Sequence, residues 1–129
     1  MVTGPVETAI RARVRSGMEL FTPTRSNPFV VERIDSRGVV LLLGPERTAT
    51  PIAWDCWEGI PKYLRSKGGE IDIGGRYTVA GNPGTLDAYL KPCAWGRATA
   101  GWVAAVLEVA GVVDIIRTRP ARARLRPGF

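Results

Sequence analysis

Residues 112–126 read VVDIIRTRPARARLR, and the period of two in this stretch decides what the end of the chain can form. Apolar residues dominate its first part and arginines alternate with apolar residues in its second, so two strands joined through residues 118–120 are expected. Arg122, Arg124 and Arg126 would then share one face of the second strand. A strand with cations on one face and apolar residues on the other is typical of a surface that binds anions.

The positive charge of the chain is concentrated at this end. The formal net charge is +6 over 129 residues. The first sixty residues balance seven arginines against seven acids, whereas five arginines stand in the last stretch with no acid among them: Arg117, Arg119, Arg122, Arg124 and Arg126. We therefore expect nucleic acid or another polyanion as the partner, and the alternative is an arginine-rich tail that only keeps the protein soluble.

The composition is that of a folded protein, with 45% hydrophobic and 23% charged residues. The longest apolar run, residues 38–44, is too short to span a bilayer, and the amino terminus lacks the order of a secretory signal. We therefore expect a cytoplasmic protein with no membrane partner. Cys56 and Cys93 are expected to be buried, reduced thiols, with a structural disulfide as the less favoured alternative.

Residues 1–53 predict an amino-terminal helix and a small antiparallel β-meander. Pro5 opens a helical pattern that ends at Gly17. The period then changes to two, and turn residues separate the successive runs 19–22, 29–34, 38–43 and 48–52.

Residues 54–129 return to helical periodicity before the closing strands. A helix from Trp54, which Pro61 is expected to kink or divide, is followed by a short strand at 70–74. Thr85 and Thr99 then stand where they would cap two further helices, the second covering residues 100–110.

This order of helix, strand, helix, helix, strand, strand resembles the winged helix-turn-helix family. The resemblance implies an α+β fold, in which the helix and meander of residues 1–53 pack on a winged helix-turn-helix domain at 54–129. It also implies that the third helix enters the major groove of double-stranded DNA and that the terminal hairpin is a wing touching the backbone. The expected function is that of a non-enzymatic DNA-binding protein, either a transcriptional regulator or an accessory protein with phage or defence roles.

The expected nucleic-acid contacts fall in two groups. Lys91, Arg97 and Thr99 surround the start of the third helix, where free amide donors favour an anion, and Arg97 is the candidate for a guanine contact. The second group is the wing, which would hold phosphates through Arg117, Arg119, Arg122, Arg124 and Arg126.

The third helix also raises an alternative function. Its outward side is expected to show small residues, which allow close approach to DNA or to a second copy of the chain, together with one acid: Gly101, Ala104, Ala105 and Glu108. A homodimer or a protein interaction module built on the winged helix is therefore the competing expectation.

The sequence offers little for catalysis, and we expect no enzyme, no cofactor, no metal and no small-molecule ligand. The chain has no histidine and two separated cysteines, which argues against ordinary zinc sites. The loop GGRYTVAGNPGT (74–85) lacks the ending of a phosphate-binding P-loop. Carboxylates considered for a magnesium nuclease are Asp35, Asp55, Glu58, Glu70 and Asp72. Among the tryptophans, Trp54 and Trp57 are expected to pack in the core, and Trp95 is the one that we consider for base stacking.

Overall fold

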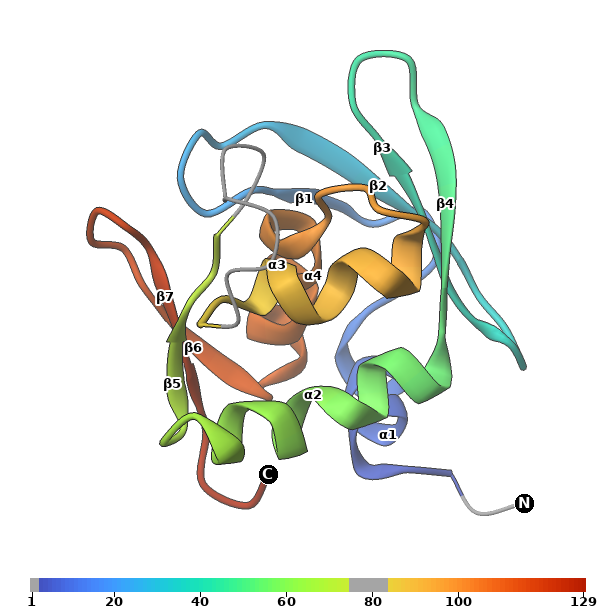
Figure 1. Ribbon diagram of the computed structural model, residues 1–129. Helices are drawn as coiled ribbons and strands as arrows, with labels where there is room; N and C mark the ends of the chain where they lie inside the picture. Colours follow the sequence, from blue (N-terminus) through green and yellow to red (C-terminus); the bar gives the residue numbers. More distant parts are fainter. Residues whose placement is uncertain (1–2, 75–83) are drawn as a thin grey trace.

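The computed structural model describes residues 3–74 and 84–129, and their fold is mixed α and β with two antiparallel sheets (Figure 1). The elements in chain order are α1 (Pro5–Arg13), β1 (Glu19–Phe21), β2 (Pro28–Ile34), β3 (Gly38–Leu43), β4 (Thr48–Ala53), α2 (Trp54–Ser66), β5 (Glu70–Asp72), α3 (Leu86–Leu90), the 3-10 helix η1 (Lys91–Ala94), α4 (Ala100–Ala110), β6 (Val113–Ile116) and β7 (Arg122–Leu125). Most of the predicted glycine-rich loop lies outside the described residues.

The first sheet is the predicted meander, with the strand order β1-β2-β3-β4. Its tight turn depends on Asp35, whose carboxylate accepts hydrogen bonds from the backbone amides of Arg37 at 2.8 Å and of Gly38 at 3.2 Å. Gly38 faces β4 so closely that a Cβ there would collide with the backbone carbonyl oxygen of Ile52. Glycine is therefore required at this turn because the two strands approach each other too closely for a side chain.

A carboxylate from α2 caps α1 and so joins the two halves of the chain. Gly4 precedes α1 and has no side chain to cap it, and Glu58 instead accepts hydrogen bonds from the amides of Val6 at 3.1 Å and Glu7 at 2.7 Å. Within α2 itself, Pro61 is buried and the helix continues through it to Ser66, so the expectation that proline divides this helix is wrong. One missing amide donor is tolerated there because the proline ring packs in the core.

The second sheet has the order β5-β7-β6 and contains the predicted terminal hairpin. Val113 pairs with Leu125 and Ile116 with Arg122, in antiparallel register. Ala123 is fully buried and Arg124 is exposed, which confirms the predicted division of β7 into an apolar and a cationic face.

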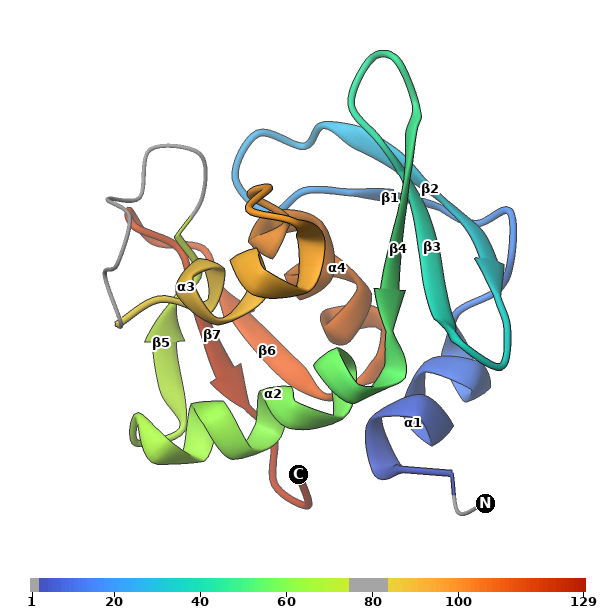
Figure 2. The same ribbon diagram turned by 45° about the vertical axis from the view of Figure 1, so that its right-hand side comes forward.

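Helix α4 lies in the middle of the protein, against α1, β1, α3 and β6 (Figures 1 and 2). Every one of its residues is buried or half-buried. Ala104 is 0% and Ala105 5% exposed, so the expectation that these residues form an outward face is wrong. The helix contains a single charged residue, Glu108, and apolar neighbours from residues 1–53 cover the side that periodicity had left open.

One hydrophobic cluster includes side chains from both halves of the chain. The apolar stripes of the predicted helices and the apolar faces of the predicted strands assign six residues to one core: Leu64, Ile71, Leu90, Val103, Leu107 and Ile115. The first five are buried, and Ile115 is only partly buried. In the described ranges, no helix has the length and apolarity needed to cross a bilayer.

A disulfide joins Cys56 in α2 to Cys93 in η1, 37 residues later. The expectation of two reduced thiols is therefore wrong. In the sequence each cysteine lies within two residues of a tryptophan, which is typical of a buried thiol. The two sulfurs meet because η1 approaches α2 in the tertiary structure, which the sequence pattern does not indicate.

Candidate nucleic-acid interface

The arginines of β7 are held by carboxylates of the neighbouring strand. Nε of Arg122 lies 2.8 Å from Glu70 Oε2, and Nε of Arg124 lies 3.1 Å from Glu70 Oε1. Arg122 also bonds Asp72. Hydrogen bonds from Arg122 and then from Arg124 hold the pKa of the Glu70 carboxyl below its usual value. The outer face of the second sheet therefore carries paired guanidinium and carboxylate groups and is not a purely cationic surface.

The remaining hairpin arginines differ in their partners. Arg117 makes a forked contact with Glu108, at 2.9 and 2.8 Å, and this contact raises the pKa of the guanidinium. Arg126 lies at 3.8 Å from Asp114. Arg119, in the turn of the hairpin, is exposed and pairs with no carboxylate in the described part of the chain.

The predicted group at the start of α4 is only partly accessible. Nζ of Lys91 lies 2.7 Å from Oδ2 of the fully buried Asp87, so its charge is already compensated. Thr99 is 1% exposed, and its hydroxyl neither caps α4 nor finds another partner among the described residues. Its assignment as a nucleic-acid contact and as a capping side chain is therefore wrong, since the chain folds it into the core. Arg97 alone in this group is exposed and without a carboxylate partner in the described ranges.

Four turns project on one side of the molecule, away from α2 and both termini (Figures 1 and 2). We call residues 22–27, 44–47, 95–99 and 117–121 the turn surface. Together they carry a single carboxylate, Glu46, and five arginines, namely Arg25, Arg47, Arg97, Arg117 and Arg119. Among the described residues, only Arg117 of these five pairs with a carboxylate.

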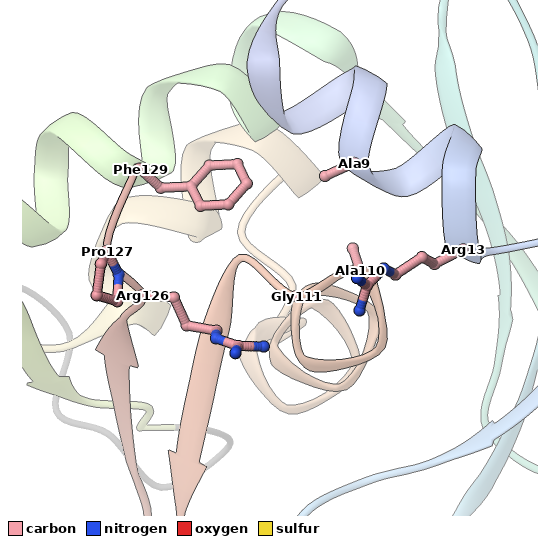
Figure 3. A pocket seen from close by; sticks show the side chains of 7 residues that line it. All are labelled: Ala9, Arg13, Ala110, Gly111, Arg126, Pro127 and Phe129. Atoms are coloured by element: carbon pink, nitrogen blue, oxygen red, sulfur yellow. The ribbon is translucent and has the colours of Figure 1, made fainter.

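A separate basic site lies at the other end, where the carboxyl end of α4 meets α1 (Figure 3). A pocket of about 500 Å³ is lined there by Arg13, Arg126 and Phe129, among others. Both guanidinium groups point toward Gly111, and a Cβ at that glycine would lie 3.3 Å from Nη1 of Arg13 and 3.7 Å from Nη1 of Arg126. Cations are favourable beside the unpaired carbonyls of a helix end. Arg126 is therefore placed away from Arg119 and the other turns.

The eight predicted contact residues consequently do not form one site. Arg97, Arg117 and Arg119 are exposed on the turn surface, whereas Thr99 is buried there. The other four lie elsewhere: Lys91 pairs with Asp87, Arg122 and Arg124 pair with carboxylates of β5, and Arg126 lines the pocket. Sequence reasoning missed Arg25 and Arg47, although each stands in a proline-containing turn, TPTRSN and GPER, where an exposed side chain is expected.

Four of the five carboxylates considered for a metal site have other roles. Asp35 shapes a turn, Glu58 caps α1, and Glu70 and Asp72 pair with arginines. Within residues 3–74 and 84–129, no three ligand side chains are grouped so that they could hold a metal ion. Comparison with protein families, with curated proteins and with solved structures finds no match to this chain.

Proposed function

We propose that the protein binds double-stranded DNA without catalysing a reaction on it, and that the turn surface is what contacts the phosphates. The observation that carries this proposal is the charge of the four turns, where five arginines stand with one carboxylate. A guanidinium offers a planar fork that matches two phosphate oxygens, and arginines spread over several turns can follow a backbone. On α1 and on the second sheet, by contrast, arginines pair with carboxylates, as Arg11 does with Glu7 and Arg122 with Glu70.

We further propose that residues 54–129 form a winged helix-like unit with the β6–β7 hairpin as its wing. The element order and the strand order β5-β7-β6 support this proposal. The burial of α4 changes how such a unit would bind, because a helix whose residues are all buried or half-buried offers few side chains to a major groove. The wing and the neighbouring turns would carry the contact instead.

The carboxylates that pair with the hairpin arginines are compatible with this role. The side chains of Arg117 and Arg124 are 55% and 59% exposed, and an exposed ion pair contributes only about 0 to 1 kcal/mol. These arginines can therefore exchange a carboxylate for a phosphate at little cost. Arg97 and Arg119 need no such exchange and should contribute most.

The test compares two double variants that lose the same charge at opposite ends. Arg97→Ala/Arg119→Ala removes two cations from the turn surface, and Arg13→Ala/Lys62→Ala removes two from α1 and α2. Duplex binding is measured by fluorescence anisotropy over a range of salt concentrations. The first variant should flatten the slope of log K against log salt by roughly 0.9 for each lost contact, and the second should leave it near the wild-type value. No binding at low salt, or equal effects of the two variants, would contradict the proposal.

A further inference from the structure

Trp95 is exposed to solvent, whereas two other tryptophans of the chain are buried. It is 75% exposed, whereas Trp57 is 0% and Trp54 8% exposed. Phe21, at 54%, is the second large apolar residue exposed in the described chain. An indole left in water loses the main stabilisation that tryptophan gives a fold. Packing in the core therefore does not explain the position of the Trp95 side chain.

The backbone holds this side chain outward. Trp95 has φ 52° and ψ 40°, the left-handed conformation that residues other than glycine rarely adopt. The turn around it is fixed by hydrogen bonds from the Gly96 amide to Lys91 O at 2.8 Å and from the Arg97 amide to Ala94 O at 3.0 Å. The disulfide at Cys93 anchors the preceding residues to α2. A strained, firmly supported residue that remains exposed is typical of a functional position.

The surroundings of Trp95 are those of a site for nucleotides. Arg97 follows two residues later, and residues 95–99 contain no acid. The turn at 22–27 approaches the start of α4, because the Cβ position of Gly101 is 3.9 Å from Cγ2 of Thr22. Aromatic side chains interleaved with arginines bind unpaired nucleotides, because bases stack on the rings while the cations hold phosphates.

We propose that Trp95 stacks on an unpaired base of DNA while Arg97 holds a neighbouring phosphate. This proposal rests on DNA binding by the turn surface and extends it from duplex DNA to DNA with an unstacked nucleotide, such as a gap or a bulge. A base–aromatic contact tolerates any sequence, since every base has a π-face. A protein with a buried α4 and no base-reading helix would thereby recognise a local structure of DNA and not its sequence.

The test compares a fully paired duplex with a duplex of the same length that carries a one-nucleotide gap opposite an unpaired base. The variant is Trp95→Gly, because glycine adopts the left-handed conformation without strain and the fold should keep its melting temperature. Trp95→Gly should weaken binding to the gapped duplex by about 5- to 100-fold, the loss that removal of one stacked base produces, and leave paired-duplex binding within about 2-fold. Trp95→Phe should restore most of the lost affinity.

Two further measurements separate the alternatives. Tryptophan emission of the wild type should be quenched by the gapped duplex more than by the paired one, and Trp95→Gly should lose this difference. Equal binding of the gapped duplex by wild type and Trp95→Gly, with paired duplex still bound, overturns the role of Trp95 and leaves the proposed function standing. Absence of binding to either duplex overturns the proposed function itself. If Trp95→Gly instead converts a dimer to a monomer in sedimentation and leaves DNA binding unchanged, Trp95 is a protein contact and the proposal is wrong.

Discussion

Arg122 of β7 reaches diagonally to Glu70 of β5, with Nε of the arginine 2.8 Å from Oε2 of the glutamate, although the two residues are 52 positions apart in the chain. The register of β5 and β7 places Glu70 opposite Arg124 and Asp72 opposite Arg122, so two acids from an early strand neutralise two arginines of the last one. A charge that looks unbalanced along the sequence is thus balanced across the sheet. Of the five arginines in the turns, four pair with no carboxylate in the described part of the chain.

Glu70→Gln should increase the affinity for duplex DNA. The substitution removes one negative charge, frees Arg124 to meet a phosphate, and leaves Asp72 as the only carboxylate bonded to Arg122. Each added phosphate contact steepens the salt dependence by roughly 0.9, so the effect is largest at low salt. Anisotropy titrations at two salt concentrations measure it. Glu7→Gln, which frees Arg11 on α1, is the matched control and should leave binding unchanged. An equal gain from both variants would indicate a general charge effect.

The Glu70 contacts also predict a pH dependence of stability. Its pKa is lowered from the usual 4.5 by Arg122 and then by Arg124, so folding is stabilised above the unfolded-state pKa and this stabilisation is lost as the pH falls through the folded-state pKa. The difference in unfolding free energy between wild type and Glu70→Gln should therefore be present at pH 7 and shrink below about pH 4.5. Urea unfolding at several pH values measures it. A difference that stays constant on acidification would show that the carboxylate is not held by these arginines.

The sequence predicts the meander, the terminal hairpin and the ends of α4 because these features are local. The apolar run at residues 38–43, the alternation at residues 122–125 and the glycine after α4 suffice. The surroundings of α4 could not be predicted in the same way. A stripe of large residues identifies one buried face, and alanines elsewhere are compatible with both an open face and a tightly packed one. That face is covered by β1 and α1, which pack on α4 through contacts between residues far apart in the sequence.

Ala104→Leu should destabilise the protein by about 1 to 3 kcal/mol, because a larger side chain does not fit into a fully buried position. Leu107→Ala, on the same helix, should cost about 2 to 5 kcal/mol through the cavity it leaves. The matched control is Ala12→Leu, at an exposed position of α1, which should stay within about 0.5 kcal/mol of wild type. Urea unfolding measures all three. A neutral Ala104→Leu would mean that α4 has a free face after all.

Lys91→Ala should affect stability and leave DNA binding unaffected. The substitution leaves the carboxylate of Asp87 buried without its 2.7 Å cationic partner, and breaking a buried pair in this way costs on the order of 3 kcal/mol. Lys62→Ala, at an exposed position of α2, removes the same charge without exposing a partner and should be nearly neutral. Thermal unfolding and the salt slope of duplex binding are measured on both. If Lys91→Ala flattened the salt slope of duplex binding and Lys62→Ala did not, Lys91 would be a DNA contact.

Cys56→Ser should lower both the stability of the fold and the advantage of gapped over paired DNA. The disulfide closes a loop of 37 residues, and the loss of such a constraint on the unfolded chain costs about 3 to 4 kcal/mol. Cys93 stands two residues before Trp95, so release of η1 from α2 should also loosen the turn that holds the indole outward. A smaller fraction of molecules would then hold Trp95 in the binding conformation, and the affinity for the gapped duplex falls in proportion to that fraction. Contacts of Arg119 with the paired duplex do not depend on this turn and should be unchanged. A reductant should lower the melting temperature of the wild type and leave Cys56→Ser unchanged. Loss of stability with an undiminished preference for the gap would show that hydrogen bonds within the turn hold Trp95 without help from the disulfide.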